Sequence, residues 1–66
     1  MMQPKLIRRK NVIEITSLSR STIDRREAEG KFPQRLSLGK NIVAWRLQDI
    51  IDWIDAQQPK NGEVLA

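Results

Sequence analysis

The chain has 66 residues, and its 12 lysines and arginines exceed its 8 aspartates and glutamates to give a net charge of +4. It contains neither cysteine nor histidine, which excludes disulfides, His-containing catalytic triads and zinc sites of the usual ligand types. A chain of this length forms one small domain with a marginal core. No apolar run reaches the roughly 18 residues of a membrane span, and no signal-peptide core follows Met1. We therefore expect a cytoplasmic protein with no metal and no cofactor.

Positive charge is concentrated in the first two thirds of the chain. Residues 1–46 hold eleven basic and four acidic side chains, a balance of +7, whereas residues 47–66 hold one basic and four acidic side chains, a balance of −3. A basic body followed by an acidic segment predicts one surface that attracts polyanions and another that faces away from them. The alternative is that these charges only keep the protein soluble.

Two short helices are the first predicted elements. Residues 9–16 carry apolar side chains at helical spacing. Ser19 is a good N-cap for a second helix over residues 20–29, because its hydroxyl can accept hydrogen bonds from the free amides of the next turn. Gly30 can adopt the left-handed conformation that ends a helix. The connection of about three residues between the helices is that of a helix-turn-helix motif.

A β-hairpin and a third helix follow. Between residues 34 and 46 apolar and polar side chains alternate, which predicts two antiparallel strands. Gly39, Lys40 and Asn41 lie between the alternating runs and form the predicted turn. From Leu47 the apolar period becomes helical again. The opposite side of this last helix carries three aspartates, which we interpret as a solvated face rather than a metal site: Asp49, Asp52 and Asp55.

The predicted fold is a small, mainly helical α+β domain of the winged helix-turn-helix type, in the order helix, helix, β-hairpin, helix. The domain covers residues 6–57, and residues 1–5 and 58–66 are predicted to be flexible ends. Trp45 and Trp53 are assigned to the core, because so small a domain needs large apolar side chains there.

The outward face of the second helix suits the major groove of DNA. With Ile23 turned toward the core, Ser21, Arg25 and Ala28 lie on the opposite side. Short side chains allow a helix to enter the groove closely, and the free amides at a helix start favour phosphates. Arg25 is placed to make a bidentate contact with guanine. The structural alternative is an ordinary capped helix whose arginines are solvated or paired with Glu29.

The hairpin is the predicted wing. Lys40 and Asn41 mark its tip, and Arg35 and Arg46 flank its strands. A narrow ribbon with a basic tip can lie along phosphates or enter the minor groove. The alternative is that the hairpin only covers the core, with charges that prevent its edges from pairing with other chains.

A combination of short motifs along the chain is more specific than any single element. These motifs are Leu18-Ser19-Arg20-Ser21-Thr22-Ile23, Gly30-Lys31-Phe32-Pro33, Leu38-Gly39, Val43-Ala44-Trp45-Arg46, Asp49-Ile50 and Trp53-Ile54. Over about residues 6–57 the sequence resembles the AlpA family of phage and prophage transcriptional regulators, which is related to excisionases and to the DNA-binding part of MerR-type proteins. The resemblance implies a winged helix-turn-helix that binds DNA near promoters or attachment sites, where it regulates genes or bends DNA for excision.

The resemblance also indicates which residues contact DNA, with the wing at residues 39–42. In this family a glycine often stands in place of Ser17, an aromatic residue in place of Asp24, and a basic residue in place of Asn41. Because Asp24 puts an acid near the DNA, we expect the preferred bases to differ from those of relatives. The predicted DNA-contacting residues are Ser19, Arg20, Ser21, Thr22, Asp24, Arg25 and Arg26 in the helix, and Arg35, Lys40, Asn41 and Arg46 in the wing.

The leading hypothesis is sequence-specific binding of double-stranded DNA by a nucleoid-associated regulator or excisionase, that is, a recombination directionality factor. One such module buries only about 600–1,000 Å² against DNA. We therefore expect a free monomer that assembles cooperatively on DNA or acts with an integrase or RNA polymerase. The alternative is a protein-interaction adaptor or inhibitor that docks through the acidic C-terminal helix. An enzyme is not expected, because no pair of catalytic groups is evident in the sequence.

Overall fold

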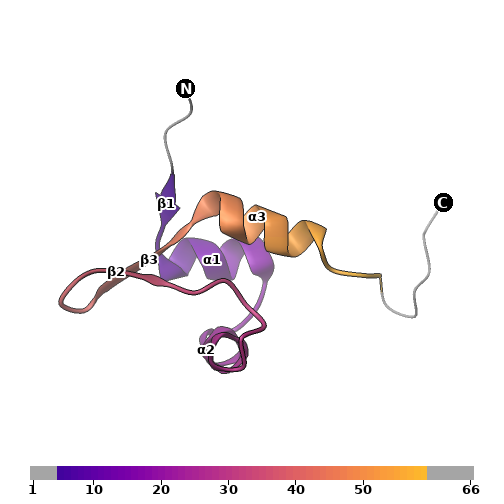
Figure 1. Cartoon of the computed structure of the whole chain (residues 1–66), viewed down its shortest axis with the longest axis horizontal. Helices are drawn as coiled ribbons and strands as arrows, with labels where there is room; N and C mark the ends of the chain where they lie inside the picture. Colours follow the sequence, from indigo (N-terminus) through magenta and orange to yellow (C-terminus); the bar gives the residue numbers. More distant parts are fainter. Residues whose placement is uncertain (1–4, 60–66) are drawn as a thin grey trace.

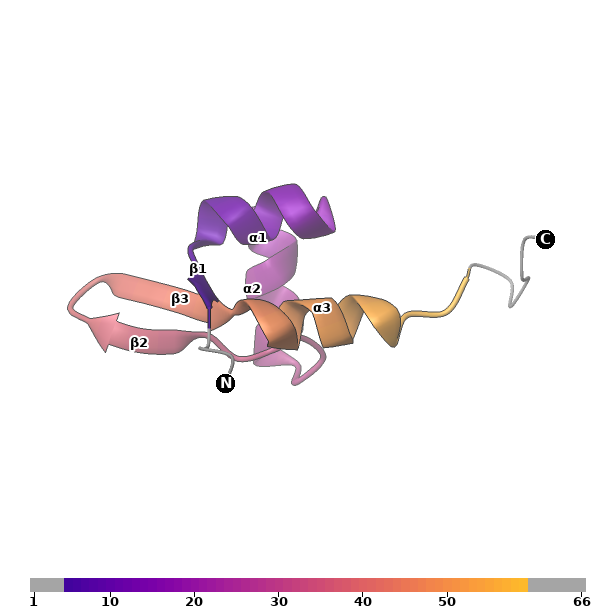
Figure 2. The same cartoon turned by 90° about the horizontal axis from the view of Figure 1, so that it is seen from above.

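The computed structural model describes residues 5–59 and shows a small α+β fold (Figures 1 and 2). In Figure 1, α2 is seen end-on while α1 and α3 lie in the plane of the view, and in both views the hairpin of β2 and β3 extends away from the helices. This arrangement is compatible with a winged helix-turn-helix. The elements in chain order are β1 (Leu6–Ile7), α1 (Arg9–Thr16), α2 (Arg20–Ala28), β2 (Leu36–Gly39), β3 (Ile42–Arg46) and α3 (Leu47–Asp55).

The predicted order omitted β1, which the structure adds to the hairpin to make a three-stranded antiparallel sheet in the order β1-β3-β2. Ile7 is paired with Trp45, and the carbonyl of Lys5 accepts a hydrogen bond from the amide of Leu47 at 2.8 Å. The backbone at residue 5, predicted to be flexible, is thus bound to the start of α3. The predictions of flexible ends for residues 1–4 and 60–66 lie outside the described residues.

Left-handed backbone conformations end the first two helices. Gly30 has a φ of +74°, and the amides after α2 bond back to Arg26 and Glu27 in the pattern of a Schellman motif. The predicted role of Gly30 is confirmed. Ser17 ends α1 with a φ of 62°. That conformation favours glycine, which explains why the family that this sequence resembles often has glycine at this position.

The hairpin turn depends on Asn41 rather than on Gly39. Asn41 has a φ of 62°, a conformation that asparagine tolerates better than most residues. Gly39 belongs to β2, where it pairs with Ile42. The register of β2 against β3 shifts between Ser37 and Gly39, so the pairing is irregular close to the turn.

The core lies between the helices and one face of the sheet. Trp45 is completely buried, and Trp53 is half-buried with its ring edge against Phe32, at 4.8 Å between centroids. Both tryptophans therefore pack in or against the core, as predicted. No helix within residues 5–59 has the length and apolarity needed to cross a lipid bilayer. The buried core cluster consists of Ile7, Val12, Ile23, Phe32, Trp45 and Ile50.

Candidate nucleic-acid interface

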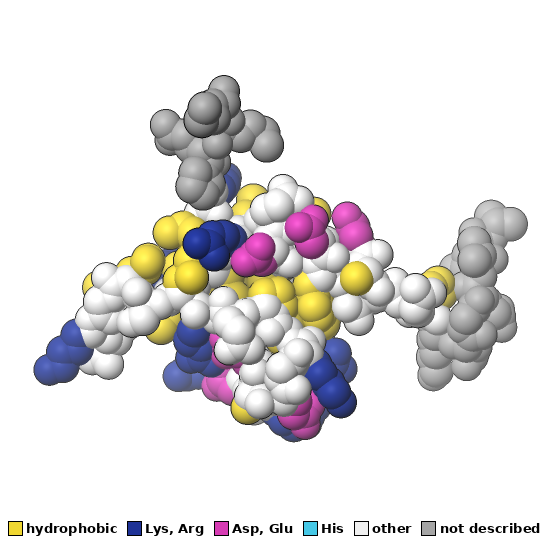
Figure 3. Space-filling view, viewed as in Figure 1, with side chains coloured by type: hydrophobic (Ala, Val, Ile, Leu, Met, Phe, Trp, Pro, Cys, Tyr) yellow, Lys and Arg dark blue, Asp and Glu magenta, His cyan; other side chains and the backbone are white. Residues whose placement is uncertain are grey.

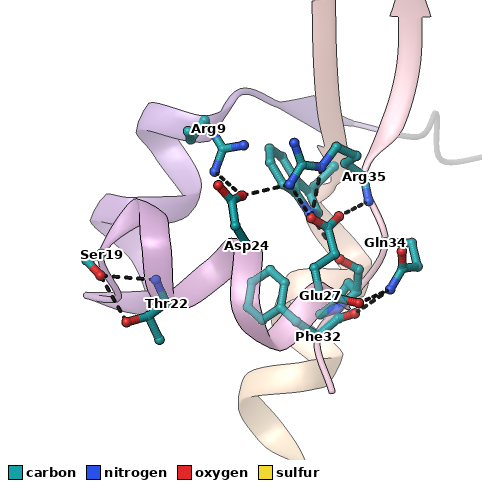
Figure 4. Close-up of polar contacts among 10 residues, drawn as sticks. Arg9, Ser19, Thr22, Asp24, Glu27, Phe32, Gln34 and Arg35 are labelled. Atoms are coloured by element: carbon teal, nitrogen blue, oxygen red, sulfur yellow. Dashed lines mark hydrogen bonds and ion pairs between the residues drawn. The ribbon is translucent and has the colours of Figure 1, made fainter. Parts of the chain in front are cut away.

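The start of α2 is fixed by the predicted cap. The Ser19 hydroxyl accepts a hydrogen bond from the amide of Thr22 at 3.2 Å and donates one to the Thr22 hydroxyl at 2.9 Å (Figure 4). Ser21 and Arg25 are exposed on the side of α2 away from Ile23, whose side chain is completely buried. The helix therefore presents the outward face that its periodicity predicts. Contacts of these hydroxyls with DNA stay a prediction.

The arginines of α2 are available to an external anion. Arg20 and Arg25 are exposed, and Arg26 is half-buried. Within residues 5–59 the ion pairs involve other arginines, so the alternative pairing of Arg25 or Arg26 with Glu29 is not formed. The positive charge of this helix is thus not neutralised from within the described part of the chain.

Asp24, the acid on the predicted recognition helix, is balanced by two arginines. Its Oδ1 lies 3.0 Å from Nη1 of Arg9 and 2.7 Å from Nη2 of Arg35 (Figure 4). Arg9 belongs to α1 and Arg35 directly precedes β2, so the two ion pairs join α1, α2 and the base of the hairpin. This pairing was not predicted. Asp24, which was expected to put an acid near the DNA, has its charge compensated within the protein.

Glu27 holds Arg35 in place from the buried side of α2. The Glu27 side chain is only 6% exposed. It accepts hydrogen bonds from the Arg35 backbone amide, from Nε at 2.8 Å and from Nη2. The Glu27 carbonyl also accepts a bond from Nε2 of Gln34 at 2.9 Å. Arg35, predicted as a wing residue, is therefore anchored at the base of the hairpin, and a DNA contact by it stays a prediction.

Trp45 supports both arginines of this network. The Cζ atoms of Arg9 and Arg35 lie 5.3 Å and 5.5 Å from the centroid of its ring, within the range of cation–π attraction. Its indole N–H donates a hydrogen bond to the carbonyl of Pro33 at 3.1 Å. Trp45 thus links the apolar core to the charged network above it.

The network changes the titration of its members. Partial desolvation disfavours the charged carboxylate of Asp24, but hydrogen bonds from Arg35 and Arg9 and their positive charges outweigh it, so the pKa of Asp24 lies below its ordinary value of 3.8. The hydrogen bond to Glu27 raises the pKa of Arg35. Arg35 therefore stays charged in the acidic range where Asp24 titrates.

Acid is expected to weaken the fold through Asp24. Because its pKa is lower in the folded chain than in the unfolded chain, its contribution to stability is present above pH 3.8 and is lost as the pH falls through the folded-state value. We expect the thermal midpoint of the wild type to fall more steeply between about pH 5 and pH 2 than that of Asp24→Asn. Thermal unfolding followed by circular dichroism measures this. Asp55→Asn is the control, and equal pH slopes for all three proteins would contradict the prediction.

The predicted wing residues do not gather at one place. Lys40 and Asn41 form the tip between β2 and β3, and both are exposed. Arg46 is the last residue of β3, at the end of the strand far from this tip, and is exposed beside β1. Only Lys40 and Asn41 are therefore placed like the tip of a wing.

A hollow of about 540 Å³ brings several predicted residues together with three that were missed. Arg20 from α2, Arg35 and Asn41 line it, as does Val43. The missed residues are Arg8, Arg9 and Lys10 at the start of α1. Their signal in the sequence is a run of three cations directly before an apolar helical period.

Charge is divided between two sides of the molecule. In Figure 3, acidic side chains lie along α3 at the top of the view, whereas basic side chains lie at the hairpin tip and around α2 at the bottom, together with some acidic ones. Basic atoms also lie where β3 enters α3. The aspartates of α3 are thus placed away from α2 and from the tip of the hairpin, as the charge pattern of the sequence predicts.

Comparisons with known proteins relate the chain to phage regulators. The model of the family described as "Prophage CP4-57 regulatory protein (AlpA)" matches residues 5–58. The chain is also similar to "Uncharacterized protein ORF88" of Enterobacteria phage P4, with 36% identity over 52 residues. That match covers 79% of this chain but only 59% of the phage P4 protein, so the chain spans less than two thirds of its relative's length. With most of its residues matched by the family, the chain belongs to the AlpA family of prophage regulatory proteins.

Proposed function

We propose that this protein binds double-stranded DNA in a sequence-specific manner, with α2 in the major groove and the hairpin of β2 and β3 on the backbone or in the minor groove. The observation that supports this most directly is the basic charge of Arg20 and Arg25, which are exposed on α2 and form no ion pair within residues 5–59. Basic side chains around α2 lie on the side of the molecule away from the acidic side chains along α3 (Figure 3). Membership of a regulatory family supports the same function.

The proposed roles follow from position. Arg25, one turn into α2 and exposed, reads a guanine edge. Ser21 and Arg20, near the helix start, contact phosphates, where the helix dipole adds to their attraction. Lys40 follows the backbone from the hairpin tip. Ser19, Thr22, Arg26, Asn41 and Arg46 remain further candidate contacts, while Asp24 and Arg35 orient α2 against the hairpin through their ion pair.

Replacing Arg25 with alanine is expected to remove sequence preference while much of the electrostatic binding remains. Loss of one bidentate contact with a base costs about 1–3 kcal/mol of discrimination. Fluorescence anisotropy on labelled duplexes from the DNA flanking the gene, with a scrambled duplex for comparison, measures both affinities. For the wild type, four to six phosphate contacts would give a salt slope of about −4 to −5.

Lys31→Ala is the control for this experiment, because it removes an exposed cation that lies outside the proposed contacts. We expect it to preserve the preference for the target duplex. Equal affinity of the wild type for target and scrambled duplexes would reduce the proposal to non-specific DNA binding. A salt slope near zero would reject DNA binding altogether.

Within this function we propose a monomer that assembles on repeated sites and regulates transcription or acts as an excisionase, with RNA polymerase or an integrase as protein partner. The small contact area of one module supports assembly. Footprinting across promoters and attachment sites distinguishes the two roles. Protection confined to promoters supports regulation, and protection at attachment sites with increased integrase-dependent excision supports the excisionase role.

A second candidate is an adaptor that docks through α3. The helix carries acidic side chains together with Ile51 and Ile54, which are 38% and 37% exposed, and with the half-buried Trp53. Tryptophan fluorescence that shifts with a protein partner but not with DNA would favour this function. An adaptor of this kind would also tolerate Arg25→Ala.

A further inference from the structure

Residues from α1, α2 and the hairpin together line the hollow between these elements. Five of its seven lining residues are lysine or arginine, and they come from the start of α1, the start of α2 and the base of the hairpin. Asn41 lines it from the hairpin tip. A cavity on so small a protein with this lining is suited to an anion.

Two of these cations are already used inside the protein, and three are not. Arg9 and Arg35 bind Asp24 and Glu27. Arg8, Lys10 and Arg20 form no ion pair within residues 5–59. Three like charges around one hollow repel one another, and an anion placed between them relieves this repulsion.

The backbone around the hollow adds to its attraction for anions. The N-cap of α1, Arg8, makes no side-chain hydrogen bond, and the first turn of α1 holds no acidic residue. The positive end of the helix dipole is therefore not compensated by the helix's own side chains. Arg20, which also lines the hollow, is the first residue of α2 and so lies at the positive end of that helix's dipole.

We propose that this hollow is the binding site of one phosphate of the DNA backbone, and that Arg8, Lys10 and Arg20 hold this phosphate. The inference rests on the proposed binding of duplex DNA and adds α1 to the contacting elements. A strand whose bases face α2 passes its backbone between α2 and the hairpin, where the hollow lies. Such a contact carries no base information, but it sets the register of α2 along the groove.

The first test is the salt dependence of binding by Arg8→Gln/Lys10→Gln. Its control is Lys5→Gln/Lys31→Gln, which removes the same charge from exposed positions outside the hollow. Loss of one phosphate contact lowers the magnitude of the salt slope by about 0.9 and weakens binding roughly eightfold near 0.1 M salt. We expect this change with target and scrambled duplexes alike for the first pair. We expect less than about a twofold change for the control pair.

The second test locates the phosphate. A series of target duplexes carries a single neutral methylphosphonate linkage at each position in turn. At one linkage, we expect neutralisation to weaken binding by the wild type and by the control pair but not by Arg8→Gln/Lys10→Gln. Arg8→Lys/Lys10→Arg keeps both charges, so we expect neutralisation of that linkage to weaken its binding as it weakens binding by the wild type.

The outcomes separate this inference from the function on which it rests. Suppose that the wild type binds target DNA, but neutralising each linkage weakens binding by Arg8→Gln/Lys10→Gln and by the control pair equally. The proposed phosphate site is then wrong, and the DNA-binding function stands. If the wild type binds no duplex at low salt, both are wrong. Circular dichroism of Arg8→Gln/Lys10→Gln shows whether the fold is kept. If it is not, Arg20→Gln, which removes the third unpaired cation of the hollow, takes its place in both tests.

Discussion

Replacing Trp45 with alanine is expected to leave much of the protein unfolded at room temperature. Trp45 is the largest completely buried side chain, and removing a buried Trp or Phe side chain costs about 3–5 kcal/mol. A domain of this length has a total stability of only about 3–10 kcal/mol. The substitution also removes the ring on which Arg9 and Arg35 lie. Urea denaturation followed by far-ultraviolet circular dichroism measures the loss.

Two variants show whether burial is the cause. Trp53→Ala removes the same atoms from a half-buried position, so we expect roughly half the loss. Trp45→Phe keeps an aromatic ring but loses the hydrogen bond to Pro33, for an intermediate loss of about 1–2 kcal/mol. A loss below about 1 kcal/mol for Trp45→Ala would show that the side chain is not the centre of the core.

Removing the Glu27 side chain is expected to give the second largest loss of stability. Glu27→Ala takes away the acceptor for the Arg35 backbone amide and the buried partner of its guanidinium. Loss of one partner of a fully buried ion pair costs about 3–5 kcal/mol. The Arg35 side chain is 34% exposed and keeps Asp24, so solvent screening lowers the expected loss to about 2–3 kcal/mol.

Glu29→Ala is the matched control, since Glu29 is an exposed glutamate two residues further along the chain. Its expected loss is within about 0.5 kcal/mol. Glu27→Gln keeps an oxygen acceptor for the Arg35 amide and should fall between the two variants. Denaturation by urea gives all three values. Equal stability of Glu27→Ala and Glu29→Ala would mean that the network contributes nothing to the fold.

Helix starts and stops were the part of the fold that the sequence specified best. Ser19 and Gly30 act locally, through hydrogen bonds to residues at most a few positions away, so their roles are visible in the sequence. β1 was missed because two residues cannot show an alternating pattern, and its pairing of Ile7 with Trp45 joins distant parts of the chain. Local patterns do not contain this information.

Burial within a helix was less predictable than the helix itself. Helical spacing groups Val12 with Ile15, yet Val12 is completely buried and Ile15 is 43% exposed, while Ile13 packs against the core. Similarly, Ile51 and Ile54 belong to the apolar period of α3 but are more than a third exposed. A helix of eight or nine residues has a choice of orientations, and only the tertiary packing decides among them.

The exposed residues of the candidate site could be predicted from the sequence. Arg25 and Lys40 are exposed, as their positions indicate. The ion-pair network was not predicted, although Glu27 follows Ile23 by four residues and therefore lies on the core side of α2. A charge in that place indicates a buried partner. That this partner is Arg35, however, depends on how the segment before β2 returns to α2.

If the protein binds DNA as proposed, the network of Asp24 has a consequence for which DNA sequences it prefers. By joining α1, α2 and the base of the hairpin, it fixes the angle between the two elements proposed to contact DNA before any DNA arrives. Less conformational entropy is then lost on binding. A preorganised pair of reading elements also leaves the duplex to adapt its groove width and curvature. We therefore expect the protein to favour base steps that deform easily, even where no side chain touches them.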